Sequence, residues 1–336
     1  MSEKRWNPVL REWVVTATHR QDRTFLPPAG YCPLCPTAPG GFPTEVPTPD
    51  YDFVVFENKF PSLRHPPYEP SIDSTALMPV ETSDGVCEVV LYSDKHDATL
   101  TDMPLEKIHQ LVKVWRDRYD ELGSVPEIDY VFIFENKGEA IGVTINHPHG
   151  QIYAFSFVPP KILREIESEN QHYAEHKKCL HCDIISGEVK VKNRLVAANE
   201  GFIAFVPFYA RYPYEVHIYA RKHLPSFAEF AEADELAFAE LLKVVLEKYD
   251  ALFGFSLPYM MVMHQKPTDG GDYPGSHFHV EFYPPNRTAQ KLKYLAGCES
   301  GAGTYVNDTL PEEKAGELRA CNSPTEKQLK IGLNIE

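Results

Sequence analysis

Residues 88–96 read Glu-Val-Val-Leu-Tyr-Ser-Asp-Lys-His, and residues 215–223 read Glu-Val-His-Ile-Tyr-Ala-Arg-Lys-His. Five of these nine positions are identical, and the two segments start 127 residues apart. Self-similarity at a fixed distance is the mark of a chain built from related units. This pair of segments therefore predicts a duplicated fold.

Three motifs recur in the same order in both parts of the chain. A Cys-x-x-Cys comes first, a Lys-His follows, and a His-x-His closes the series; the members are Cys32/Cys35 and Cys179/Cys182, His96 and His223, His147/His149 and His277/His279. From the Lys-His to the His-x-His there are 51 residues in the first part and 54 in the second. We therefore predict two homologous halves, over 5–158 and 173–305, in units 1–172 and 173–336.

Each half contains short segments rich in Val, Ile, Phe and Tyr, which favour strands. The predicted strands are 86–92, 129–135, 151–155, 202–206, 215–220, 258–263 and 278–283. Apolar residues at helical spacing predict long helices over 105–122 and 227–253. Most links between strands are too short for crossover helices, so we expect an α+β fold with a largely antiparallel sheet and helices packed on one face. Between residues 26 and 80, where prolines gather, we expect an irregular segment.

The composition indicates a folded protein and excludes several classes. The 336 residues are 43% hydrophobic, enough for a large core, and the formal net charge is −15. A nucleic-acid-binding protein would carry a basic surface, so we exclude nucleic acid as a partner. No apolar run approaches the ~20 residues of a membrane span, and the first residues do not read as a secretory signal. We therefore expect a cytoplasmic protein with no membrane partner.

Four of the seven cysteines form the two Cys-x-x-Cys pairs. In a chain of this size and compartment, such pairs favour metal binding over disulfides. Cys32 and Cys35, completed by His96 and His147, would form a closed tetrahedral structural zinc site. A redox role is less well supported because the βαβ context of thioredoxin is absent. The repeat predicts a second site from Cys179, Cys182, His223 and His277.

The segment His147-Pro-His149-Gly-Gln151 places two histidines at the start of a predicted strand. Neutral imidazole is a suitable nucleophile toward phosphorus, and a backbone carbonyl bonded to its other nitrogen would fix the useful tautomer. Gly150 would let another group approach the backbone closely, which suits a phosphate. The amide of Gln151 could donate to a phosphoryl oxygen in the transition state. The alternative is that the two histidines only bind metal or pack within the sheet.

This segment and its surroundings resemble the galactose-1-phosphate uridylyltransferases, a branch of the histidine-triad superfamily. The likeness covers most of the chain, and its further landmarks are Arg5-Trp-Asn-Pro, Trp13-Val-Val, His19-Arg20-Gln-Asp-Arg23, Phe56-Glu-Asn58-Lys-Phe60, Phe134-Glu-Asn136-Lys-Gly138 and Tyr283-Pro-Pro285. The resemblance implies a duplicated histidine-triad-like fold and an enzyme of galactose metabolism. UDP-glucose and galactose 1-phosphate would exchange a uridylyl group in a ping-pong reaction through a uridylyl-His149 intermediate.

The resemblance also assigns roles to residues. His149 would be the nucleophile, and Gln151 would act on the transition state. Asn58 and Asn136 would contact the nucleotide, and Thr144 stands where the family usually has serine near the phosphates. Phosphate and hexose contacts would come from Arg20, Arg23, Lys293 and Glu299. Family sites are completed by a second subunit, which implies a homodimer. The segment around Glu299 departs from the best-known members, which puts the hexose-side assignment in doubt.

For the second metal, the family offers a different ligand set: Glu165, His264, His277 and His279, reported with iron or zinc in some members. Both sets use His277. Because thiolates select zinc strongly, we prefer the cysteine-containing set with zinc, and keep iron as the alternative metal.

Two other functions fit the same scaffold. An adenylyl-transferring sugar-nucleotide phosphorylase or a nucleotide hydrolase would share the nucleophile, but such relatives tend to replace Pro148 or Gln151, or lack a second full half. A zinc-stabilised nucleotide-binding protein without activity would not need His149 and Gln151. The intact His-Pro-His-Gly-Gln segment favours the uridylyltransferase.

Overall fold

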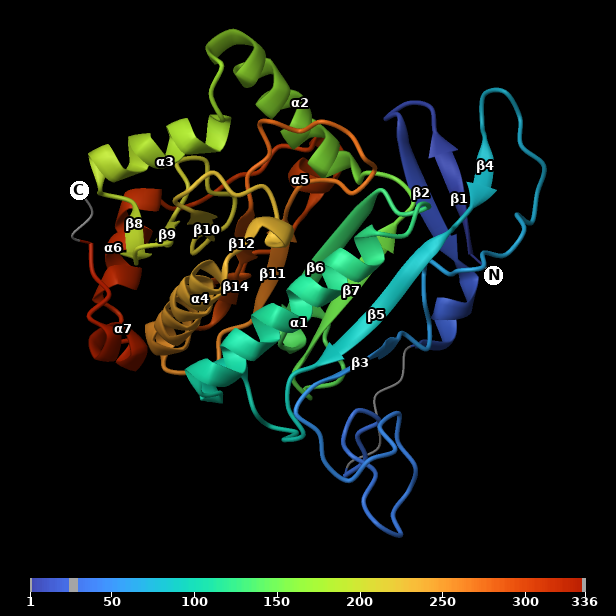
Figure 1. Cartoon of the computed structure of the whole chain (residues 1–336), viewed down its shortest axis with the longest axis horizontal. Helices are drawn as coiled ribbons and strands as arrows, with labels where there is room; N and C mark the ends of the chain where they lie inside the picture. Colours follow the sequence, from blue (N-terminus) through green and yellow to red (C-terminus); the bar gives the residue numbers. More distant parts are fainter. Residues whose placement is uncertain (1, 24–29, 334–336) are drawn as a thin grey trace.

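A nine-stranded sheet forms the centre of the molecule in the computed structural model, which describes residues 2–23 and 30–333, except for the side chains of residues 22 and 23 (Figure 1). In sheet order the strands are β3 (Val54–Glu57), β5 (Gly85–Leu91), β7 (His149–Phe155), β6 (Tyr130–Lys137), β11 (Tyr259–His264), β12 (His279–Tyr283), β10 (Val216–Ala220), β9 (Phe202–Phe205) and β8 (Leu195–Ala198). All neighbouring strands in this sheet pair antiparallel, so the predicted antiparallel α+β fold is confirmed.

The strand order displays the duplication. β5, β7 and β6 are followed by β11, β12 and β10, so the two trios are mirrored about the β6–β11 pair. That central pairing runs from Tyr259 opposite Lys137 to Val262 opposite Phe134. The largest hydrophobic cluster contains residues from both parts of the chain. The two repeats therefore share one continuous sheet and one core.

All seven predicted strands exist, with ends that differ from the prediction by no more than two residues. The first predicted helix is α1 (Leu105–Gly123). The second is divided into a short 3-10 turn, η4 (Phe227–Glu229), and the long helix α4 (Glu232–Phe253). The division arises because the backbone is extended at Phe230, after which the Asp234 carboxylate accepts the N–H of residue 231 and starts α4.

α1 and α4 lie side by side across one face of the sheet (Figure 1). Trp115 of α1 and Phe238 of α4 are fully buried in the same cluster as the strand residues Val131 and Val280. Burying a large apolar side chain contributes about 1.5–3 kcal/mol, so this layer supplies much of the stability of the fold.

α2 (Pro160–His176) and α3 (Leu180–Val191) lie against the opposite face. Ile166 of α2 packs with Tyr130 of β6. The next residue of β6, Val131, packs in the cluster that contains α1. Since neighbouring residues of a strand point to opposite faces, α2 lies on the face away from α1. Ile185 of α3 packs with Phe205 in the same way. The expectation that all helices share one face was therefore wrong. α2 has few buried apolar residues among its charged ones, so its sequence pattern did not stand out as a helix.

The remaining elements lie around this sandwich. They are β1 (Ser2–Asn7), β2 (Glu12–Ala17), η1 (Thr18–Arg23), β4 (Val80–Thr82), η2 (Leu100–Asp102), η3 (Glu139–Ile141), β13 (Asn286–Thr288), β14 (Lys291–Leu292), α5 (Gly297–Ala302), α6 (Pro311–Ala320) and α7 (Pro324–Leu329). Between residues 30 and 79, β3 is the one regular element that the structure describes, which agrees with the expected irregular segment. Within the described ranges, no helix is long and apolar enough to span a bilayer.

Candidate active site

His149 is the first residue of β7, at the edge of a cavity of about 450 Å³. The ring nitrogen Nδ1 lies 2.7 Å from the backbone oxygen of His147. Because a carbonyl can only accept, Nδ1 carries the hydrogen and Nε2 keeps the lone pair. The predicted tautomer-fixing contact is thus present, and it comes from the other histidine of the pair.

The cavity collects five of the residues that the sequence singled out: His149, Gln151, Asn58, Asn136 and Thr144. They come from β7, β6, the end of β3 and the loop between β6 and β7. The remaining lining residues are Tyr31, Pro33, Leu34, Glu45, Phe56, Lys59, Phe60, Val89, Ile141, Gly142, Val143 and Ile145. Apolar walls with a few convergent polar groups are typical of a ligand-binding pocket.

Two amide side chains line this cavity, and their existing hydrogen bonds define which of their atoms can contact a ligand. Gln151 is 7% exposed, and its Oε1 has no hydrogen-bond partner among the described residues. An unsatisfied buried acceptor is costly, so Oε1 suits a donor group of a ligand, while the NH₂ group of the same amide is the part that can donate. The Oδ1 of Asn58 accepts the N–H of Phe60 at 2.9 Å, so its NH₂ group is the part that can serve a ligand.

Gly150 has a different purpose from the one expected. A Cβ at this position would lie 2.0 Å from the Tyr92 hydroxyl and 3.2 Å from the carbonyl oxygen of Phe134. Both atoms are on the side of the sheet that faces α1, because Tyr92 packs against Trp115 there. Glycine is therefore required by a tyrosine behind the strand, and the interpretation that it makes room for a phosphate was wrong.

Three other predicted residues do not line the cavity. The Arg20 guanidinium lies 3.2 Å from the Tyr153 hydroxyl. Lys293 and Glu299 form a salt bridge of 3.2 Å with each other in the segment around α5. The side chain of Arg23 lies outside the described residues. The cavity of one chain thus holds the residues predicted to act on the nucleotide, but not Arg20, Lys293 or Glu299.

The first cysteine pair forms the predicted cluster. Cys32, Cys35, His96 and His147 present ligand atoms within 4.8 Å of one another. The Cys35 sulfur lies 3.5 Å from Nδ1 of His96 and 3.6 Å from Nδ1 of His147. Tetrahedral zinc, with bonds of about 2.3 Å to sulfur and 2.0 Å to nitrogen, separates such atoms by about 3.5 Å. The donor set therefore fits zinc.

The surroundings of His147 favour zinc binding by its ring. Burial lowers its pKa to about 4, so the ring is neutral at physiological pH. Its Nε2 donates to the backbone oxygen of Ser93 at 2.8 Å, which leaves Nδ1 as the ligand atom. This is the outer contact usual for metal-binding histidines. Tyr51, which the sequence analysis missed, also contacts Nε2 at 2.6 Å.

The second cysteine pair repeats this geometry. Cys179, Cys182, His223 and His277 gather within the same 4.8 Å limit. Nδ1 of His277 lies 3.5 Å and 3.6 Å from the two sulfurs, and its Nε2 donates to the backbone oxygen of Ala220 at 2.7 Å. The set predicted from the repeat is thus assembled, and it too fits zinc.

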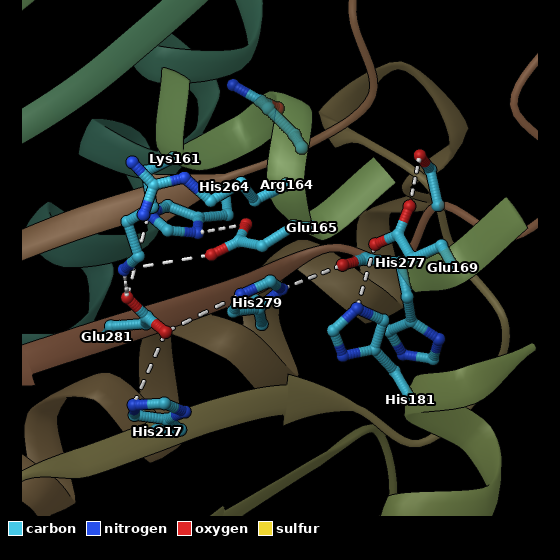
Figure 2. Close-up of polar contacts among 12 residues, drawn as sticks. Lys161, Arg164, Glu165, Glu169, His181, His217, His264, His277, His279 and Glu281 are labelled. Carbon is cyan, nitrogen blue, oxygen red and sulfur yellow. Dashed lines mark hydrogen bonds and ion pairs between the residues drawn. The ribbon is translucent and has the colours of Figure 1, made fainter. Parts of the chain in front are cut away.

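A third cluster also exists (Figure 2). Glu165 of α2, His264 of β11, and His279 and Glu281 of β12 converge on the side of the sheet that α2 covers. Nδ1 of His264 lies 2.8 Å from the Glu165 carboxylate, and its Nε2 lies 3.7 Å from Glu281. Two carboxylates and two imidazoles could hold a divalent metal such as iron or zinc.

This arrangement corrects the two alternatives drawn from the sequence. The sets do not compete for His277, because that ring turns to the cysteines while Glu281 takes its place in the third cluster. The reason lies in β12: His279 and Glu281 are alternate residues of a strand and share a face, whereas His277 precedes the strand. The spacing His279-x-Glu281 was a signal for this pair that the sequence analysis overlooked.

Basic side chains around Glu281 offset its negative charge in the third cluster. Burial by itself would raise the pKa of Glu281, but His217, His264 and Lys161 hold it well below its usual range. Lys161 forms an ion pair with Glu281 and lies 3.7 Å from Glu165 (Figure 2). The cluster is therefore an ionic network as well as a candidate metal site.

Comparison with known proteins finds matches along most of the chain. Residues 1–159 match the family described as galactose-1-phosphate uridyl transferase, N-terminal domain, and residues 165–329 match the corresponding C-terminal domain. The galactose-1-phosphate uridylyltransferase of Thermotoga maritima is 43% identical over 95% of this chain and 98% of its own. A solved structure of a uridylyltransferase is 34% identical with a TM-score of 0.84, covering 97% of this chain and 99% of the other.

A phosphorylase is similar to a lesser degree. An ADP-glucose phosphorylase from Arabidopsis thaliana, solved with bound ADP-glucose, is 25% identical with a TM-score of 0.72, over 96% of this chain and 99% of the other. Both the identity and the superposition are lower than for the uridylyltransferase structure.

Proposed function

This chain belongs to the galactose-1-phosphate uridylyltransferase family, and from that premise we propose that it exchanges a uridylyl group between UDP-glucose and galactose 1-phosphate. One observation carries the proposal. His149 stands at the nucleotide-sized cavity with Gln151, Asn58, Asn136 and Thr144, and its tautomer is set for attack through Nε2.

The first half-reaction forms the intermediate. Nε2 of His149 attacks the α-phosphorus of UDP-glucose, the bond from that phosphorus to the bridging oxygen breaks, and glucose 1-phosphate leaves with the electron pair. Charge grows on the non-bridging oxygens as the phosphorus becomes five-coordinate, and the Gln151 amide donates to one of them. The Nδ1–H of His149 keeps donating to the carbonyl oxygen of His147, and this hydrogen bond stabilises the positive charge on the ring.

The second half-reaction reverses the first with another sugar. A phosphate oxygen of galactose 1-phosphate attacks the uridylyl phosphorus, the phosphorus–Nε2 bond breaks, and UDP-galactose leaves. The same residues serve both directions because the two acceptors differ only in the hexose. Asn58, Asn136 and Thr144 keep the uridylyl group in place between the two steps.

The proposal predicts a covalent adduct. Wild-type protein mixed with UDP-glucose alone should gain the mass of one uridylyl group per active site, and galactose 1-phosphate should remove it. ADP-glucose under the same conditions should give little adduct, and this arm discriminates the adenylyl-transferring alternative. Intact-mass spectrometry reads all three results. An adduct with ADP-glucose and none with UDP-glucose would reassign the chain to the phosphorylases.

The metals are proposed to be structural. We assign zinc to the two cysteine-containing clusters, because thiolate and imidazole donors in a closed tetrahedron favour it. Zinc at the first cluster would hold His147, and thereby the start of the strand that carries His149. Iron or zinc is the candidate for the third cluster, which has no cysteine. None of the residues in these three clusters lines the cavity that contains His149.

The charged residues that the cavity lacks are proposed to come from a second copy of the chain. Arg20, Lys293 and Glu299 do not line the cavity of their own chain. In a symmetric homodimer, Arg20 and Arg23 would meet the phosphates, and Lys293 and Glu299 the hexose, of the partner's site. The unit 1–172 would then contribute residues to both active sites of the dimer, and the unit 173–336 would contribute Lys293 and Glu299 to the partner's site. We also propose a cytoplasmic location. The seven cysteines are free thiols in the structure, and disulfides are rare in that compartment.

A mixing experiment tests this arrangement. His149→Ala and Arg20→Ala chains are each expected to be nearly inactive, but a mixed dimer has one complete site made from His149 of one chain and Arg20 of the other. Random exchange of equal amounts should restore activity to about one quarter of the sites. Mass photometry or native mass spectrometry confirms that exchange took place. Mixed dimers as inactive as the parents would contradict the shared site.

A further inference from the structure

A buried polar group lies behind the strand that carries His149, on the side covered by α1 and α4. Tyr92 and Tyr259 are each 1% exposed and belong to the large hydrophobic cluster, and Glu135 between them is 6% exposed. The Tyr259 hydroxyl donates to Oε1 of Glu135 at 3.1 Å, and the Tyr92 hydroxyl interacts with the same carboxyl group. Burying a carboxyl in a core costs free energy even when it is hydrogen-bonded, and the proposed chemistry does not use this one.

Tyr92 contacts the catalytic segment at two points. Its backbone N–H donates to the carbonyl oxygen of Pro148 at 3.1 Å. Its hydroxyl fills the space that a side chain on Gly150 would need. The ring is held by an edge contact with Trp115 of α1, with centroids 6.1 Å apart. Tyr92 thus bears directly on the residues before and after His149.

Glu135 is fixed relative to the same segment by the sheet. Its neighbour Phe134 pairs with Gln151 in the β6–β7 register, so a shift of Glu135 would shift the catalytic strand. Burial raises the pKa of Glu135 to about 7, against the opposing effects of Lys137 and the two tyrosine hydroxyls. The second carboxyl oxygen, Oε2, is buried without a hydrogen-bond partner among the described residues, so the carboxyl keeps an acceptor that the Tyr92 hydroxyl can use.

We propose that Tyr92 and Glu135 are positioning residues for the nucleophile. The carboxyl holds the Tyr92 hydroxyl against Gly150, the Tyr92 backbone holds Pro148, and together they fix the direction in which the His149 ring points. The inference rests on the proposed function of His149. A misplacement of ~1 Å at a reacting group can cost about 10²-fold in rate, so a small displacement behind the strand is sufficient to be measured.

Single-turnover kinetics test the proposal. Enzyme in excess is mixed with UDP-glucose and quenched, and uridylyl-enzyme is counted by mass. Tyr92→Phe should lower the rate constant of adduct formation about 10-fold or more, while the apparent Kd for UDP-glucose changes less than about 2-fold, because the cavity lining is untouched. Glu135→Leu should slow the same step, and Glu135→Gln, which keeps an acceptor oxygen, should recover most of the rate.

Two comparisons separate positioning from general destabilisation. Tyr249 is equally buried in the same cluster, but its hydroxyl donates to the backbone oxygen of Tyr214, away from the catalytic strand. Tyr249→Phe should therefore lower Tm without slowing adduct formation. If Glu135 acts through Tyr92, the Tyr92→Phe/Glu135→Leu double variant should be no slower than the slower single variant.

Unchanged adduct formation in Tyr92→Phe, or an equal slowing in Tyr249→Phe, would overturn the inference while leaving the proposed function intact. Fully additive effects of Tyr92→Phe and Glu135→Leu would also overturn it, because the two residues would then act separately. Wild-type protein that forms no adduct would instead remove the proposed function, and this inference with it.

Discussion

His149→Ala is expected to form no uridylyl-enzyme and to lose turnover by at least about 10⁴-fold, because His149 is the one imidazole among the described residues that line the cavity. The fold should survive the change. His149 is partly exposed at a strand start, and zinc at the first cluster would be bound by His147 rather than by this ring. Intact mass after UDP-glucose, steady-state kinetics and zinc content measure the three parts of the expectation.

The duplicated half provides a matched control. His279 occupies the position in β12 that His149 has in β7, and its Nδ1 lies 2.9 Å from the backbone oxygen of His277, as the Nδ1 of His149 does from His147. His279→Ala should nevertheless leave adduct formation largely intact, since its ring belongs to the third cluster. Turnover that survives in His149→Ala, or adduct lost in His279→Ala alone, would sink the assignment of the nucleophile.

The two predicted halves have the same kind of cysteine–histidine cluster but differ at the second histidine of the His-x-His motif. Each still has a Cys-x-x-Cys cluster completed by two histidines, with the second histidine bonded through Nε2 to a backbone carbonyl. Where the first half has His149 and Gln151 facing a cavity, the second has His279 and Glu281 facing Glu165 and His264. Where the first half has the amide of Gln151, the second has the carboxylate of Glu281 in a buried ionic network, and we propose that the first half carries the nucleophile while the second stabilises the fold.

Much of the fold and of the candidate site could be predicted from the sequence, because short segments of the chain specify them. The repeat predicted two related halves, and the structure adds that their strands are arranged as mirrored sets within one sheet. Cys32, Cys35 and the residues around His149 are carried by short motifs whose side-chain types and spacing define a site. Five residues of the cavity were also expected: His149 and Gln151 from their motif, and Asn58, Asn136 and Thr144 from the family resemblance.

The rest depended on contacts between distant segments. Glu165 reaches His264 because α2 crosses the second face of the sheet, and no pattern in either segment reports that crossing. The direction of the His277 ring depends on where β12 begins, a boundary that sequence reasoning leaves uncertain by two or more residues. The reason for Gly150 lay in Tyr92, which is 58 positions away in the sequence. Contacts of this kind produce no motif or residue spacing in the sequence that could predict them.

Cys32→Ser is expected to lose one zinc per chain and to lower Tm on the order of 10 °C. A ligand present at about 1,000 times its Kd stabilises the native state by about 4 kcal/mol, and that contribution disappears with the site. The effect on chemistry at bound substrate should be smaller, because His149 and the cavity residues remain, although His147 loses its metal. Cys179→Ser should lower Tm similarly with no effect on the rate of adduct formation, since its cluster lies in the other half.

Cys321→Ser is the control, because this cysteine belongs to none of the three clusters and its thiol only donates to the backbone oxygen of Glu317. It should retain both zinc ions and nearly the wild-type Tm. Metal analysis and scanning calorimetry on the three variants, together with chelator titration of the wild type, separate the sites. Since a structural site contributes its binding free energy to folding, removing zinc must lower Tm if the clusters hold the metal as assigned. A fully folded wild type that contains no metal and keeps its Tm in chelator would contradict both assignments.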